Sequence, residues 1–219
     1  MNLRKNGFYF MVIGVISELI LPFILGVFVS DFNQIINVIS KFGETKGFVN
    51  IVFKTWEITN GILFLMAIPA FFTRFRNTSK KLARYLSLSI GLFALGDCIL
   101  TGLFDSSMLN FKIINIGKFI HGSASLVAFI AIIIGILILG KLYSLEKNRK
   151  MANITIINFI LVGIFMILFA VSKVDFLYNI IGRYRGLWQK LSLLFTFLPF
   201  FIVAVNSIFN NIENKNSLF

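Results

Sequence analysis

Ionisable side chains lie inside long apolar stretches of the sequence, where such residues are rare. They are Glu18, Lys54, Glu57, Asp97, Lys118, His121 and Lys190. A charged side chain in the middle of a bilayer costs about 2.5–3.5 kcal/mol on insertion scales, so these residues usually face other helices and have partners there. Three readings are open: a structural polar network, a pocket for a small solute, ion or lipid headgroup, or acid–base chemistry by His121 with Asp97 or Asp105.

The spacing of these polar residues places each set on one helix face. Glu18 belongs to a series of small or polar residues that recurs every four positions, and His121 and Ser125 are likewise four positions apart. Residues with this spacing share one side of a helix. At about 1.5 Å per residue, Glu57 and Asp97 lie roughly 10–12 Å below the same membrane face. The sequence therefore predicts a polar pocket that is open at this face and closed toward the other.

The elements that must position these side chains are membrane-spanning helices. The sequence is 58% hydrophobic and only 14% charged, and a spanning helix needs about 20 apolar residues. We expect an all-α bundle of six transmembrane helices that forms a single membrane domain over residues 1–219. The expected spans are Phe8–Val29, Val49–Phe72, Leu82–Phe104, Ile116–Gly140, Met151–Val171 and Leu187–Phe209. The first resembles a signal peptide, but it is longer than a signal core and contains Glu18 and Pro22, so we interpret it as a permanent span.

The basic residues predict the orientation. Of the Lys and Arg residues outside the spans, 11 lie on the side of the two termini and 6 on the other side. The richer side of a membrane protein is usually cytoplasmic. We expect a cell-membrane protein with both termini inside and the polar pocket facing outward.

The segment between the first two spans has two interpretations. Residues 31–42 carry Phe32, Ile35, Ile36, Ile39 and Phe42 at helical spacing. They predict either a short amphipathic helix on the outer surface or an ordinary apolar loop.

Several functions are disfavoured by what the sequence lacks. With a single histidine and no HExxH, GxSxG or P-loop motif, it shows no hydrolase or nucleotide-binding pattern. A metal held by His121 with Glu18, Glu57 and Asp97 is conceivable, but we expect no metal and no cofactor. The net charge of +12 is explained by the basic loops, so we expect membrane lipids and a small solute or ion as partners, and no nucleic acid. An enzyme is the less favoured class.

Four short segments carry a resemblance to a known family. They are 31–43 (DFNQIINVISKFG), 101–105 (TGLFD), 121–125 (HGSAS) and 184–192 (YRGLWQKLS). Their order and spacing relative to the spans resemble domain of unknown function 998, a prokaryotic family of six-helix membrane proteins. Two departures are Asp105, which follows Phe104 where many members have a proline, and Lys190, which stands where Arg is common. The resemblance implies a multi-pass location and places His121, Asp105 and the 186–190 segment near one another, but implies no activity.

The candidate site combines these residues. We expect the polar pocket to be lined by eight side chains. They are Glu18, Lys54, Glu57, Asp97, Asp105, His121, Ser125 and Lys190. Lys190 lies close to a span end and is also expected to reach toward the membrane surface. An accessory or scaffolding subunit is the main alternative, in which the same residues only hold the helices together.

The orientation is directly testable. A reporter enzyme that is active only in the cytoplasm, fused after Phe219, should be active, because the basic residues hold that side inside. The same reporter inserted between residues 31 and 42 should be inactive. The opposite pair of results would invert the predicted topology.

Overall fold

The computed structural model describes residues 3–104 and 116–216. All regular structure in this part of the chain is helical, and six helical segments are long and apolar enough to cross a membrane. The main helices are α1 (Leu3–Gly26), α3 (Phe48–Phe75), α4 (Lys80–Phe93), α6 (Ile116–Leu145), α7 (Arg149–Val171) and α8 (Arg185–Asn216). The short elements are α2 (Lys41–Glu44), η1 (Ala94–Leu100), α5 (Thr101–Leu103), η2 (Asp175–Leu177) and η3 (Gly182–Tyr184).

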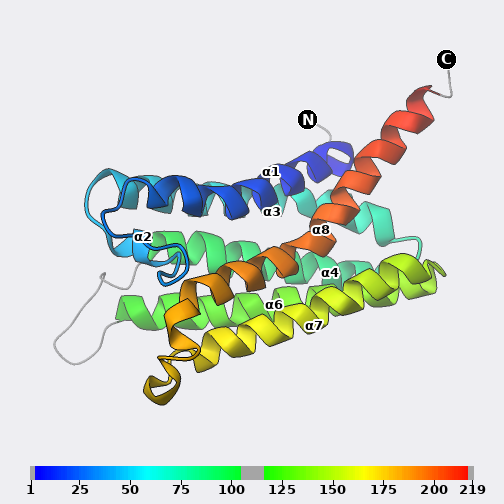
Figure 1. Ribbon diagram of the computed structural model, residues 1–219. Coiled ribbons are helices and arrows are strands. Elements are labelled where there is room, and N and C mark those ends of the chain that lie inside the picture. Colours follow the sequence, from blue (N-terminus) through cyan, green and yellow to red (C-terminus); the bar gives the residue numbers. More distant parts are fainter. Residues whose placement is uncertain (1–2, 105–115, 217–219) are drawn as a thin grey trace.

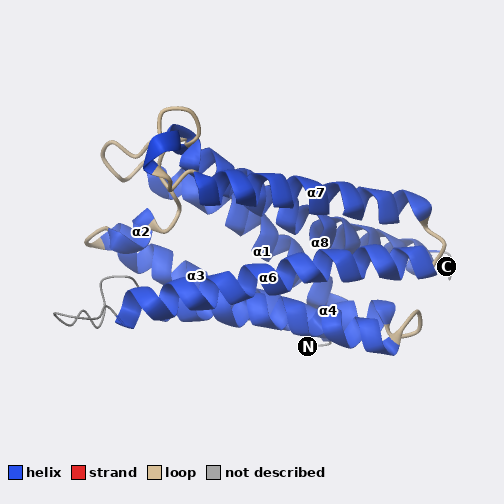
Figure 2. Cartoon of the chain, turned by 90° about the horizontal axis from the view of Figure 1, so that it is seen from below, coloured by secondary structure: helices blue, strands red, loops and turns tan. Residues whose placement is uncertain are grey.

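The long helices form a closed ring in chain order. Helix α1 packs on α3 and α8, α3 on α4 and η1, α4 on α6, α6 on α7, and α7 on α8. Both chain ends lie at one end of this bundle, together with the turns that follow α3 and α6 (Figures 1 and 2). We call this the termini end. The opposite end carries residues 27–47 and 172–184, and we call it the loop end.

The outer surface is as apolar as the interior, which agrees with a membrane location. On α7, Ile156, Ile160, Ile164 and Ile167 are all about half exposed or more. A soluble monomer rarely shows such a continuous apolar face. The chain is therefore a multi-pass membrane protein, as the sequence predicted.

The third span is not a continuous α-helix. It begins as α4, widens into the π-helix η1 and ends in the single turn α5. Small residues let η1 approach its neighbours closely: a Cβ on Gly96 would lie 2.8 Å from the Ala124 carbonyl oxygen, and a Cβ on Gly61 would lie 2.8 Å from that of Ala94. The wide turn thus fits between α3 and α6 and directs Asp97 inward.

The segment before α3 corrects one interpretation of the sequence. Residues 31–40 form a series of turns, and the only helical residues between 31 and 47 are the four of α2. The amphipathic helix is therefore wrong, and the loop interpretation is nearer. The apolar spacing has another cause, because Ile39 and Phe42 are buried in the bundle while Ile35 and Ile36 are exposed.

Aromatic side chains close the middle of the bundle. Phe64, Phe93 and Phe197 come from α3, α4 and α8 and are at most 1% exposed. Their ring centroids are 5.2–5.8 Å apart, which is the usual range for favourable aromatic pairs. This aromatic layer separates the loop end from the termini end.

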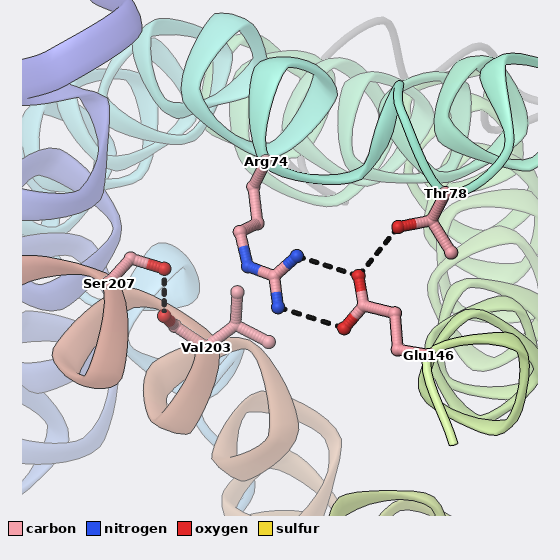
Figure 3. A network of polar contacts seen from close by, with 5 residues as sticks. All are labelled: Arg74, Thr78, Glu146, Val203 and Ser207. Carbon is pink, nitrogen blue, oxygen red and sulfur yellow. Dashed lines mark hydrogen bonds and ion pairs between the residues drawn. The ribbon is translucent and has the colours of Figure 1, made fainter. Parts of the chain in front are cut away.

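An ion pair joins two turns at the termini end (Figure 3). Arg74 at the end of α3 donates from Nη1 and Nη2 to the two carboxylate oxygens of Glu146, at 2.7 and 2.9 Å. The Thr78 hydroxyl also donates to Glu146, at 2.6 Å. Burial raises the pKa of Glu146, but the hydrogen bonds from Arg74 and Thr78 outweigh it and hold this pKa below its ordinary value of 4.5.

The ion pair predicts a pH-dependent stability. Because the pKa of Glu146 is lower in the folded state, its stabilising effect is complete above the unfolded pKa and is lost as pH falls through the folded one. At pH 7, Glu146→Gln should lower the free energy of unfolding by about 1 kcal/mol, or the melting temperature by roughly 2–4 °C. The difference from wild type should shrink below pH 4. Thermal unfolding in detergent between pH 3 and 8 measures it.

A matched control removes one donor only. Thr78→Val keeps both bonds from Arg74, so it should destabilise by less, about 0.5 kcal/mol. Equal melting temperatures for wild type and Glu146→Gln at pH 7 would contradict a stabilising role for this pair.

Candidate functional site

A cavity of about 350 Å³ lies in the loop-end half of the bundle. Three carboxylates from three different elements line it: Glu18 from α1, Glu57 from α3 and Asp97 from η1. Phe129 forms part of its wall and also contacts Phe93 of the aromatic layer. The cavity thus has an acidic interior and is bounded by that layer on the side of the termini end.

Glu18 is held by a short chain of hydrogen bonds. It is 4% exposed, and the Nδ2 of Asn60 on α3 donates to its Oε2. Asn60 in turn accepts a hydrogen bond from the Ser17 hydroxyl at 3.0 Å. This network fastens α1 to α3 at the depth where the cavity ends.

Asp97 is held in a similar way. Its Oδ1 accepts a hydrogen bond from the Ser125 hydroxyl of α6. Within the wide helix turn, the Thr101 hydroxyl donates to the Asp97 carbonyl. Asp97 and Ser125, paired here, were both expected in the pocket, and both line it.

Glu57 differs from the other two carboxylates. It is 8% exposed and lines the cavity, yet it accepts no hydrogen bond from any residue in the described part of the chain. Leaving a buried acceptor without a donor costs about 1–3 kcal/mol, and more when the group is charged. The Glu57 oxygens are not among the fully buried atoms of the described residues that lack a partner, so they reach the cavity, where water or a ligand can supply the donor.

His121 lines the mouth of the cavity, at the start of α6. Its Nδ1 is 3.2 Å from the carbonyl oxygen of Phe104. The ring is thus oriented by the end of the third span. Within the described residues, no three His, Cys, Asp or Glu side chains are placed to hold a metal ion.

The segment before α3 folds over the beginning of α8 and completes the cavity wall with Val38, Ile39 and Ser40. Its backbone carbonyls at Ile35 and Ile36 accept hydrogen bonds from Leu187 and Gly186, at 2.9 and 3.2 Å. Gly186 is required there, because a Cβ would lie 2.3 Å from the Asn37 carbonyl oxygen. A loop expected on the membrane surface is therefore part of the site.

Lys190 fastens the same loop. Its ammonium donates to the carbonyl oxygens of Gln34 and Asn37, at 2.9 and 3.1 Å. These partners belong to the segment at the loop end, so Lys190 holds that segment against the start of α8. It is also not among the described residues that line the cavity, so its place is in the supporting wall.

Two further residues were expected to line the pocket, Lys54 and Asp105. Lys54 is half-buried on α3, and the described lining of the cavity does not include it. Asp105 lies outside the described residues.

Sequence reasoning missed the basic rim of the cavity. Lys173 after α7 and Arg185 at the start of α8 both line it, although the sequence suggested only loop charges. Their cationic groups lie 5.5 and 5.6 Å from the ring centroid of Phe169. The Arg185 Nε is buried and has no hydrogen-bond partner among the described residues. Their position in the sequence could have indicated this role, because Lys173 directly follows one span and Arg185 directly precedes another.

Comparison with known proteins assigns the family. The model of the family described as "Protein of unknown function (DUF998)" matches residues 12–206. The chain belongs to the DUF998 family. No curated protein and no solved structure matches it.

In this DUF998 protein, the segments that carried the resemblance meet at the loop end. His121 and Ser125 of segment 121–125 and Arg185 and Gln189 of segment 184–192 line one cavity. The side-chain Oε1 of Gln189 accepts from the backbone N–H of Ile39 at 2.7 Å. Ile39 and Thr101, from the other two segments, also line the cavity, so all four motif segments meet at its wall.

The Glu18–Asn60 contact predicts a specific stability pattern. Asn60→Leu should destabilise the DUF998 protein by about 1–3 kcal/mol, because Glu18 keeps its buried acceptor but loses the donor. Ser17→Ala, which leaves that donor in place, should cost less. Adding Glu18→Leu to Asn60→Leu should recover part of the loss, since both polar partners are then removed. Unfolding in detergent measures wild type and the three variants, and a double variant that is less stable than Asn60→Leu alone would contradict the contact.

Proposed function

We propose that this protein binds a small solute carrying a protonated amine, in the loop-end cavity, as the binding step of a transport or sensing process. The observation that supports the proposal is Glu57, a buried carboxylate that faces the cavity without a hydrogen-bond donor from the described chain. An ammonium group supplies both the donor and the opposite charge. Hydrogen bonds between ionised groups are roughly twice as strong as neutral ones.

The other two carboxylates support an amine and not an anion. Glu18 and Asp97 line the same cavity, and each already accepts one hydrogen bond from the protein. A carboxylate has about four acceptor positions, so both retain capacity for a ligand. A low-dielectric cavity with three acidic groups favours a cation and repels an anion at its inner end.

The aromatic layer favours a binding pocket over an open channel. Phe64, Phe93 and Phe197 are fully packed beyond the cavity, so a solute that enters from the loop end stops there. Transport would require these rings to separate in a second conformation. The basic residues at the termini end support placing that end in the cytoplasm, and the cavity then faces outside.

The rival functions have less support. A purely structural network accounts for Glu18 and Asp97, which have protein partners, but it gives no reason for Glu57. Acid–base chemistry by His121 is not favoured either, because its ring contacts a backbone carbonyl and the Asp97 carboxylate contacts Ser125.

Ethanolamine is a suitable probe for the proposal. Calorimetric titration of the purified protein at pH 7 should show binding to wild type, and Glu57→Gln should weaken it about tenfold or more, or by at least ~1.4 kcal/mol. Gln keeps the size of the side chain but removes its charge.

The matched control is Asp31→Asn, which removes an exposed carboxylate at the same end of the bundle. Asp31 has φ 59°, and Asn accepts this backbone conformation equally well. Asp31→Asn should bind ethanolamine like wild type. The proposal fails if wild type and Glu57→Gln, both with wild-type melting temperatures, respond alike to ethanolamine.

A further inference from the structure

The cavity opens sideways between α6 and α7. The two helices lie close at the termini end and diverge toward the loop end in both views (Figures 1 and 2). Three residues of these helices line the cavity and are also exposed on the outer surface: Gly122 and Leu126 on α6 and Ala170 on α7. Leu126 is 61% exposed, so in a membrane these positions contact lipid. The cavity is therefore continuous with the lipid-facing surface.

The charges of the cavity are separated by depth. The cations Lys173 and Arg185 stand at the loop-end limits of α7 and α8, whereas the carboxylates of Glu18, Glu57 and Asp97 belong to turns inside the spans. The lining residues Arg185 and Ser192 are about 10 Å apart along α8, at 1.5 Å per residue. A ligand that matches this layout is anionic at its outer end and cationic at its inner end.

We propose that the natural ligand is a phospholipid whose headgroup carries a phosphate and a primary ammonium, as in phosphatidylethanolamine. This assignment rests on the proposed amine-binding function and names its ligand class. The ammonium lies at Glu57, the phosphate at Lys173 and Arg185, and the acyl chains leave between α6 and α7 along Leu126 and Ala170. The buried Arg185 Nε, which has no partner among the described residues, is a donor for a phosphate oxygen.

A primary ammonium fits better than a quaternary one. Carboxylates bind through N–H donors, and a quaternary ammonium has none. Quaternary groups are instead recognised by the faces of aromatic rings. Among the described residues, three phenylalanine rings line the cavity, and each already has partners. Phe169 contacts Lys173 and Arg185, Phe129 contacts Phe93, and Phe53 contacts Phe42 and Trp56.

Lipid retention measured by native mass spectrometry tests the assignment. The protein is purified in mild detergent and mixed with phosphatidylethanolamine, phosphatidylcholine or phosphatidylglycerol of identical acyl chains. Phosphatidylethanolamine should bind about tenfold more tightly than either of the others, and Glu57→Gln should abolish this preference. Equal retention of the three lipids would overturn the assignment.

Two glycine variants test the side opening. Gly122 lines the cavity and Gly163 is on α7 outside it, and a Cβ at either would meet nothing within 4 Å. Both positions can therefore accept a Cβ without a clash. Gly122→Leu should lower lipid affinity more than ethanolamine affinity, while Gly163→Leu should change neither. Equal effects of the two variants on lipid retention would contradict entry between α6 and α7.

The outcomes separate this inference from the proposed function. If ethanolamine binding depends on Glu57 but the lipids bind equally, the lipid assignment is wrong and the amine-binding function stands. If soluble phosphoethanolamine binds as tightly as the lipid, the ligand is a soluble phosphate ester and entry from the bilayer is wrong. If no amine binds in a Glu57-dependent way, both proposals fail.

Discussion

The structure depends on one constraint: a carboxylate inside a membrane bundle needs a donor, because the lipid supplies none. Asn60 supplies the donor to Glu18, and Ser125 supplies the donor to Asp97. Each of these hydrogen bonds joins two helices. The polar residues therefore fix which helix faces meet at the loop end. Glu57 lines the same cavity without a donor among the described residues, so the same constraint leaves it as the group on which the proposed binding depends.

The two ends of the bundle are stabilised in different ways. At the termini end, a two-pronged ion pair joins the turns that follow α3 and α6, and the aromatic layer separates this end from the cavity. At the loop end, helix-to-loop hydrogen bonds from Lys190, Gln189 and the α8 backbone hold a folded-back segment over a cavity. These contacts are only partly buried, and such contacts open at lower free energy than packed cores do. The loop end is thus the part of the molecule suited to admit a ligand.

The spans and the grouping of polar residues could be predicted because both follow from local pattern. Apolar length determines the helices, and the spacing of Glu18, Glu57 and Asp97 brings them to one cavity. What failed depends on contacts between distant segments. The path of residues 31–40 is determined by α8, and the roles of Lys173 and Arg185 depend on where the ends of α7 and α8 meet. No spacing rule within one helix contains that information. The widened turn of η1 was likewise not predicted, because apolar spacing along one span does not distinguish a π-turn from an α-turn, and the close approach of Gly96 to α6 is a contact between distant segments.

That widened turn has a consequence for the evolution of the chain. A π-helical turn is a single-residue insertion carried inside a helix. Deleting one residue from η1 would restore a regular α-helix, in which the flanking turns keep their faces but the residues inside the former wide turn do not. Asp97 lies inside that turn, so its contact with Ser125 would be lost. The length of this segment is therefore as constrained as its side chains, and insertions or deletions should be tolerated in the loops long before they are tolerated here.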